Sequence, residues 1–98
     1  MPLMQIKKEV CDAYNIQEAE LNLTRRGHFN EARNVAVYLI RYLRNDTLNQ
    51  VGDQFGIEKY STVSSIVERV KNEMNFRKGF KKRVEEIADK IIKSQRQT

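Results

Sequence analysis

The stretch TLNQVGDQFGIEKYSTVSSIVERV, residues 47–70, decides the fold. Thr47 with Gln50 three residues later is the pattern of a capping box, which begins a helix, and Gly56 stands where a helix commonly ends. Apolar residues recur at helical spacing again from about Tyr60 onward, so a second helix follows after a short turn. Two helices joined in this way have the outline of a helix-turn-helix.

Helical periodicity extends over most of the remaining chain. In each segment the apolar residues fall on one stripe, and no alternating strand pattern is found. The predicted helices cover approximately residues 3–14, 30–44, 48–55, 60–74 and 76–93. A short segment at 17–23 and a polar loop at 24–28 separate the first two, and Asn30 is the expected N-cap of the second. The sequence therefore predicts an all-α, five-helix single domain over residues 1–98, with the helix-turn-helix at about 47–74.

Composition excludes several classes of protein. Ninety-eight residues suffice for one hydrophobic core, but they are too few for most cofactor enzymes built on a large sheet. A single cysteine, Cys11, cannot form an internal disulfide, and one cysteine with one histidine cannot supply the four ligands of a structural zinc site. No apolar run is long enough for a signal peptide or a membrane span. We therefore expect a cytoplasmic protein without cofactor, metal site or membrane segment.

No set of residues has the pattern of a catalytic site. The acidic residues Asp12, Glu18 and Glu20 are scattered and have no base paired with them, and Cys11 has no histidine near it in the sequence. We therefore expect a binding protein rather than an enzyme.

The outward side of the helix predicted from Tyr60 carries groups that suit base recognition. The residues that its apolar stripe leaves facing away are Tyr60, Ser61, Thr62, Ser64, Ser65 and Arg69. Hydroxyl groups donate and accept hydrogen bonds at base edges, a threonine methyl can touch a thymine methyl, and arginine forks onto guanine or phosphate. Serine and threonine are also common at any helix start because they cap it, so this cluster alone leaves both interpretations open.

Basic residues favour a polyanionic partner. The net charge is +5 and the pI is near 9.5. Arg25 and Arg26 lie in the polar loop, and Arg33 lies in the first turn of a helix, where a cation opposes the helix dipole. A phosphate bound there would resolve that conflict. Residues 69–83 contain seven basic side chains and one acidic one, and we expect this run near the junction of the last two helices, within reach of a duplex held by the helix at 60–74.

Three segments resemble a known family in register. They are ARNVAVYL at 32–39, VGDQFG at 51–56 and YSTV at 60–63. They resemble the C-terminal DNA-binding domain of the bacterial replication initiator DnaA, which carries P-R-Q-hydrophobic-A-hydrophobic-Y-L, I-G-x-x-F-G and D-H-T-T-V at matching spacing. The pattern A-R-x-V-A-V-Y-L, I-G-x-x-F-G-I and Y-S-x-V-S, found in the DnaA-like C-terminal domain of REP-associated tyrosine transposases, is closer still, and the chain resembles it past Val84.

The resemblance implies a TrpR-like helix-turn-helix that binds double-stranded DNA. By position, the residues that would read bases in the major groove are Lys59, Tyr60, Ser61, Thr62 and Ser65, with Arg69 on the same face. Arg25 and Arg26 would belong to a basic loop that reaches the minor groove or the backbone, and Arg33 would hold a phosphate. The DNA-binding domain of a transposase-like or replication-initiator-like protein, associated with the nucleoid, is the function that this implies.

Departures from the family pattern limit what the resemblance implies. Lys59-Tyr60 stands in place of Asp-His, so the sequence preference of the initiator is not carried over. The chain has neither a nucleotide-binding P-loop nor the paired-histidine metal site of the transposases. A homo-oligomer and a covalently linked catalytic domain in a longer parent both stay open. The alternative function is a helical protein-interaction module with no DNA role, and a basic amphipathic helix at 76–83 on a membrane surface is a third interpretation.

Overall fold

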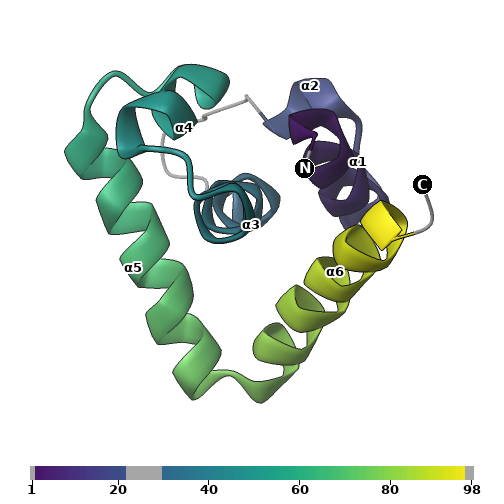
Figure 1. The fold of residues 1–98 in the computed structure, drawn as a ribbon. Helices are drawn as coiled ribbons and strands as arrows, with labels where there is room; N and C mark the ends of the chain where they lie inside the picture. Colours follow the sequence, from purple (N-terminus) through teal and green to yellow (C-terminus); the bar gives the residue numbers. More distant parts are fainter. Residues whose placement is uncertain (1, 22–29, 97–98) are drawn as a thin grey trace.

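The computed structural model describes residues 2–21 and 30–96, and it is all-helical over them. The elements are α1 (Leu3–Tyr14), α2 (Glu18–Leu21), α3 (Glu31–Leu39), the π-helical segment η1 (Ile40–Arg44), α4 (Leu48–Phe55), α5 (Tyr60–Phe76) and α6 (Lys78–Arg96). Figure 1 shows α5 and α6 as the two arms of a V with α3 between them. Helix α4 lies beside the start of α5, and α1 lies beside the later part of α6. None of the described helices is long and apolar enough to cross a membrane.

The predicted all-α fold is confirmed, with three local differences. The segment at 17–23 contains the one-turn helix α2, held by the buried Leu21, so the described residues form six α-helices rather than five. The helix predicted over 30–44 changes to π-helical hydrogen bonding at Ile40. The last helix begins at Lys78 because Arg77 has extended backbone angles, φ −115° and ψ 97°, that separate it from α5.

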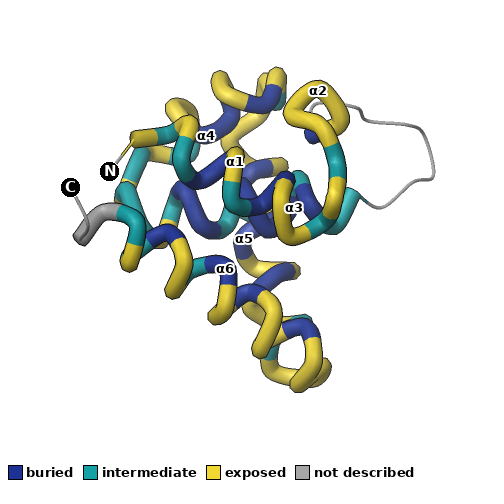
Figure 2. The backbone as a smooth tube through the Cα atoms, turned by 90° about the vertical axis from the view of Figure 1, so that its right-hand side faces the viewer, coloured by how far each residue is buried: buried dark blue, intermediate teal, exposed yellow. Residues whose placement is uncertain are grey.

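Helix α3 is the centre of the hydrophobic core. Asn30 caps its start as predicted, since the Asn30 side chain accepts a hydrogen bond from the backbone N–H of Arg33. Most of α3 is buried, and it packs against both α1 and α5. The stripe predicted for α6 is buried too, and consists of Phe80, Val84, Ile87 and Ile91. Figure 2 shows buried segments gathered at the centre of the bundle and buried and exposed positions alternating along α6.

The turn between α4 and α5 is built as the sequence predicts. The Thr47 hydroxyl accepts from the N–H of Gln50 at 3.1 Å and the Gln50 side chain accepts from the N–H of Thr47 at 2.9 Å, which completes the capping box. Gly56 ends α4 in the left-handed conformation, φ 66°. A Cβ added at Gly52 would lie 2.7 Å from the carbonyl oxygen of Ile57 and 3.3 Å from a methyl of Val63. Only glycine therefore allows α4 to approach the turn and α5 this closely.

The Gly52→Ala variant is predicted to lose about 1–3 kcal/mol of unfolding free energy, because the new methyl meets a backbone carbonyl that cannot rotate away. Gly79→Ala is the matched control. Its Cβ meets nothing within 4 Å and lies in α6, where alanine is favoured over glycine by about 0.5–1 kcal/mol. Urea unfolding of both variants measures the difference, and equal stability of the two would contradict the close packing at Gly52.

A polar cluster joins α1, α3 and the start of α6. The Tyr14 hydroxyl donates to Glu31 at 2.6 Å, and guanidinium nitrogens of Arg77 and Arg83 lie 3.7 and 3.8 Å from the same carboxylate. The Arg83 guanidinium also lies 5.0 Å from the centre of the Tyr14 ring. Burial raises the pKa of Tyr14 above its ordinary value, and the hydrogen bond to Glu31 raises it further by a smaller amount.

This raised pKa predicts an alkaline loss of stability. Neutral Tyr14 stabilises the fold fully below its unfolded pKa near 10, and the contribution is lost as pH rises from there through the higher folded pKa. The Tyr14→Phe variant is expected to be about 1.5–3 kcal/mol less stable at pH 7, because it lacks the hydrogen bond to a charged group. Its stability should also fall less steeply than that of the natural chain above pH 10. Urea unfolding against pH tests this, and parallel curves for the two proteins would refute it.

Candidate nucleic-acid interface

The first turn of α5 is open to solvent. Lys59 stands at the N-cap with extended backbone angles, and within the described ranges no side chain caps the helix. Residues 60–62 are exposed, and Tyr60 shows 62% of its surface, whereas Val63 directly after them is fully buried. The sequence therefore anchors the helix at Val63 and leaves the hydroxyl-rich end before it projecting outward.

The predicted base-reading residues share this exposed side. The exposed members of the set are Lys59, Tyr60, Ser61, Thr62, Ser65 and Arg69. Arg69 forms an ion pair with Glu73 at 3.4 Å, one helical turn further on. Ser64 differs from the expectation: it is half-buried and lines a groove against α3 and η1 rather than facing outward. Arg25 and Arg26 lie outside the described residues.

Arg33 has an incompletely satisfied guanidinium. Its side chain is half-buried, and one terminal nitrogen donates to the Asn34 side-chain oxygen at 3.4 Å. Its Nε is buried, and no described residue accepts a hydrogen bond from it. Burial lowers the pKa of Arg33 because removing the charge from water is unfavourable. A buried donor without an acceptor costs free energy, and an anion such as a phosphate could approach only the part of the guanidinium that remains accessible.

The basic run at 69–83 divides into two roles. Arg77 and Arg83 lie close to the Glu31 carboxylate and therefore stabilise the fold. Lys78, Lys81 and Lys82 are exposed, but they lie beyond the C-terminal end of α5 (Figure 1). The 17 residues of α5 span roughly 25 Å, so these lysines are that far from the open first turn. As the sequence predicts, this part of the run lies near the junction of α5 and α6, at the opposite end of α5 from the open first turn. Its contact with a duplex stays a prediction.

Sequence reasoning missed Lys7, a residue that positions the motif. Lys7 is buried, and its Nζ donates to the backbone carbonyl of Gln54 at 3.3 Å, at the C-terminal end of α4. The same ammonium lies 5.0 Å from the centre of the Phe55 ring. A cation at this end of a helix complements its dipole, so Lys7 ties α1 to α4. Its position three residues before Val10, on the buried side of α1, is the signal that was available.

The Lys7→Ala variant is predicted to lose about 1–3 kcal/mol of unfolding free energy, since it removes a charged hydrogen bond and the contact with Phe55. Lys8→Ala is the control, because Lys8 is exposed on the same helix and should change stability by less than about 0.5 kcal/mol. Thermal and urea unfolding compare the two. A Lys7 variant as stable as the Lys8 variant would show that this contact does not hold α4.

Comparison with known families agrees with this geometry. The family model described as "Bacterial dnaA protein helix-turn-helix" matches residues 3–70, which is more than half of the chain. The chain belongs to this family. Membership of the DnaA helix-turn-helix family supports DNA binding through α4 and α5.

Curated relatives match over most of the chain. The chromosomal replication initiator protein DnaA of Spiroplasma citri is 33% identical over 88 residues, which cover 89% of this chain and 20% of the relative. That of Streptococcus thermophilus is 30% identical over 92 residues, covering 93% and 20%. That of Sulfurimonas denitrificans is 29% identical over 90 residues, covering 91% and 21%. The chain thus spans about one fifth of the length of the relatives it matches.

Proposed function

We propose that this chain binds double-stranded DNA sequence-specifically, with the first turn of α5 in the major groove. The observation that supports this most is the open start of α5, where residues 60–62 are exposed directly before the buried Val63. Short hydroxyl side chains there can approach base edges, and the helix N-terminus favours a nearby phosphate. Lys59 and Tyr60 would give a sequence preference different from that of relatives with Asp-His at these positions.

Arg33 supplies the second part of the proposal. The outer nitrogens of its half-buried guanidinium would donate to a backbone phosphate and fix the position of the motif on the duplex. Arg25 and Arg26, assigned from the sequence, would contact the backbone or the minor groove. Such a domain would act at the nucleoid, as the DNA-binding domain of a replication-initiator-like or transposase-like protein. The resemblance to the transposase domain rests on the sequence patterns alone.

The experiment is selection of bound sequences from a random duplex pool, followed by affinity measurements on the selected duplex over a range of salt. If about five phosphates are neutralised, the slope of log K against log salt is about −4 to −5. Arg33→Ala should weaken binding to all sequences alike and reduce the slope by about 1, whereas Thr62→Ala should change which sequence is preferred. Lys90→Ala, on the exposed side of α6, is the control and should leave both quantities unchanged.

Two results would overturn the proposal. A chain that selects no sequence and shows no salt-dependent duplex binding is not a DNA reader, and a protein-interaction module would then be the better description. An unchanged sequence preference in Thr62→Ala would show that the first turn of α5 does not read bases.

A further inference from the structure

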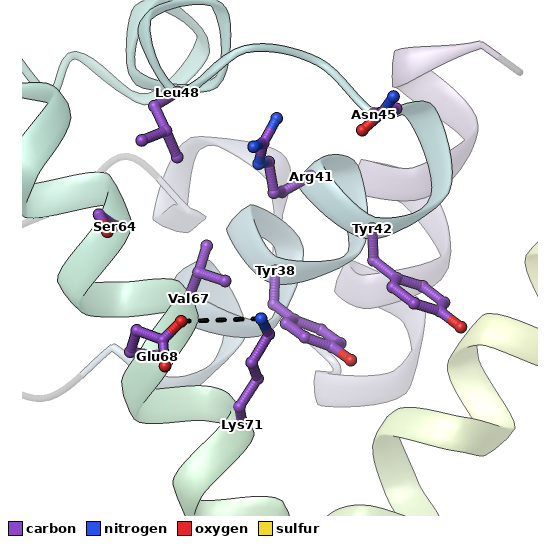
Figure 3. Close-up of a pocket in the computed structure, with 9 residues that line it drawn as sticks. All are labelled: Tyr38, Arg41, Tyr42, Asn45, Leu48, Ser64, Val67, Glu68 and Lys71. Atoms are coloured by element: carbon purple, nitrogen blue, oxygen red, sulfur yellow. Dashed lines mark ion pairs between the residues drawn. The ribbon is translucent and has the colours of Figure 1, made fainter.

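A groove lies beside α5, on the flank next to its exposed reading side. It has a volume of about 320 Å³, within the range of small-molecule sites. It is bounded by the end of α3 and η1, the start of α4 and the middle of α5. The side chains that line it include Tyr38, Arg41, Tyr42, Ser64, Glu68 and Lys71 (Figure 3).

Two stacked tyrosines form one wall of this groove. The Tyr38 and Tyr42 rings are nearly parallel, at 6°, with centroids 5.8 Å apart. Tyr38 is half-buried, while Tyr42 exposes 68% of its surface from the π-helical segment η1. The two rings are stacked on each other while much of the Tyr42 side chain remains open to solvent. Such a surface suits another flat aromatic group, because aromatic rings favour stacked arrangements.

Charged groups line the groove on its α5 side and on its η1 side. Lys71 pairs with Glu68 at 3.6 Å across the α5 side of the groove, as Figure 3 shows. Arg41 lies on the η1 side and donates to the backbone carbonyl of Asp46 at 2.5 Å. Cations can neutralise a phosphate, and a carboxylate can accept from the amino groups of a base. An aromatic platform with basic neighbours is the combination that binds single-stranded nucleic acid.

If α5 lies in the major groove as proposed, the groove lies beside the path of one DNA strand. Ser64 and Glu68 line it, whereas the adjacent Ser65 and Arg69 lie on the reading side of α5. Successive residues of a helix are about 100° apart, so the two surfaces are roughly a quarter turn from each other. A helix in the major groove has one backbone strand on each flank, and the tyrosines lie on one flank only.

We infer that this groove binds an unpaired nucleotide of the strand that continues from a duplex held on α5, with its base stacked on Tyr42 and its phosphate near Arg41 and Lys71. The inference rests on the proposed function. It extends that function, because the chain would then recognise junctions between double-stranded and single-stranded DNA.

Fluorescence anisotropy of the full chain tests this with four probes. They are the selected duplex, the same duplex with a short single-stranded tail at a 5′ end, the same with the tail at a 3′ end, and a duplex whose tail is abasic. A tail of one polarity should tighten binding about fivefold or more, because the groove lies on one flank. The abasic tail keeps the phosphates but removes the bases, so it should give no such gain.

Variants identify the residue responsible. Tyr42→Ala should abolish the gain from the tail while duplex affinity stays within about twofold, and Tyr42→Phe should retain the gain because it keeps the stacking ring. Phe76→Ala removes another exposed aromatic ring at the far end of α5 and should retain the gain. A tail carrying 5-iodouracil should cross-link to Tyr42 under ultraviolet light, as located by mass spectrometry.

The outcomes separate the two proposals. Duplex binding that gains nothing from either tail, gains equally from both, or gains as much from an abasic tail overturns the groove assignment and leaves the proposed function standing. A gain that survives Tyr42→Ala overturns the assignment as well. If neither the duplex nor the tailed duplexes bind, the proposed function fails, and the inference fails with it.

Discussion

The close approach at Gly52 is the constraint on which the rest of the structure depends. The carbonyl of Ile57 and a methyl of Val63 occupy the space that any Cβ would need. This contact sets the turn that follows Gly56, and with it the angle at which α5 leaves α4. Because Val63 is then fixed in the core, the three residues before it must project from the molecule.

Helix α1 connects the two halves of the candidate interface. Lys7 near its beginning bonds to the end of α4, and Tyr14 at its end bonds to Glu31 in the first turn of α3, two residues before Arg33. The polar contacts of α1 thus hold both the helix that carries the turn and the helix that carries the arginine proposed to bind phosphate. Arg77 and Arg83 lie close to the same carboxylate of Glu31, so these two residues of the basic run stabilise the fold rather than bind a ligand.

Local signals in the sequence predicted the elements well, and contacts between distant residues were not predictable from them. The caps at Asn30, Thr47 and Gly56 are short-range patterns with one physical meaning each, and all three are confirmed. The π-helical turns of η1 were missed because hydrogen-bond register leaves no mark in apolar spacing. The buried Lys7 was missed because its partner lies 47 residues away, and a lysine ordinarily indicates a solvated position. The roles of the reading residues stay predictions.

The most direct test of the central claim is an NMR titration of the isotope-labelled chain with the selected duplex, following each backbone amide. If the open end of α5 enters the major groove, the largest shift changes fall on residues 59–65 and on Arg33. The exposed side of α6 beyond Glu85 should then show almost none. Changes concentrated on Lys78, Lys81 and Lys82, with residues 59–65 unmoved, would contradict the account, because the duplex would then lie about 25 Å from the proposed surface.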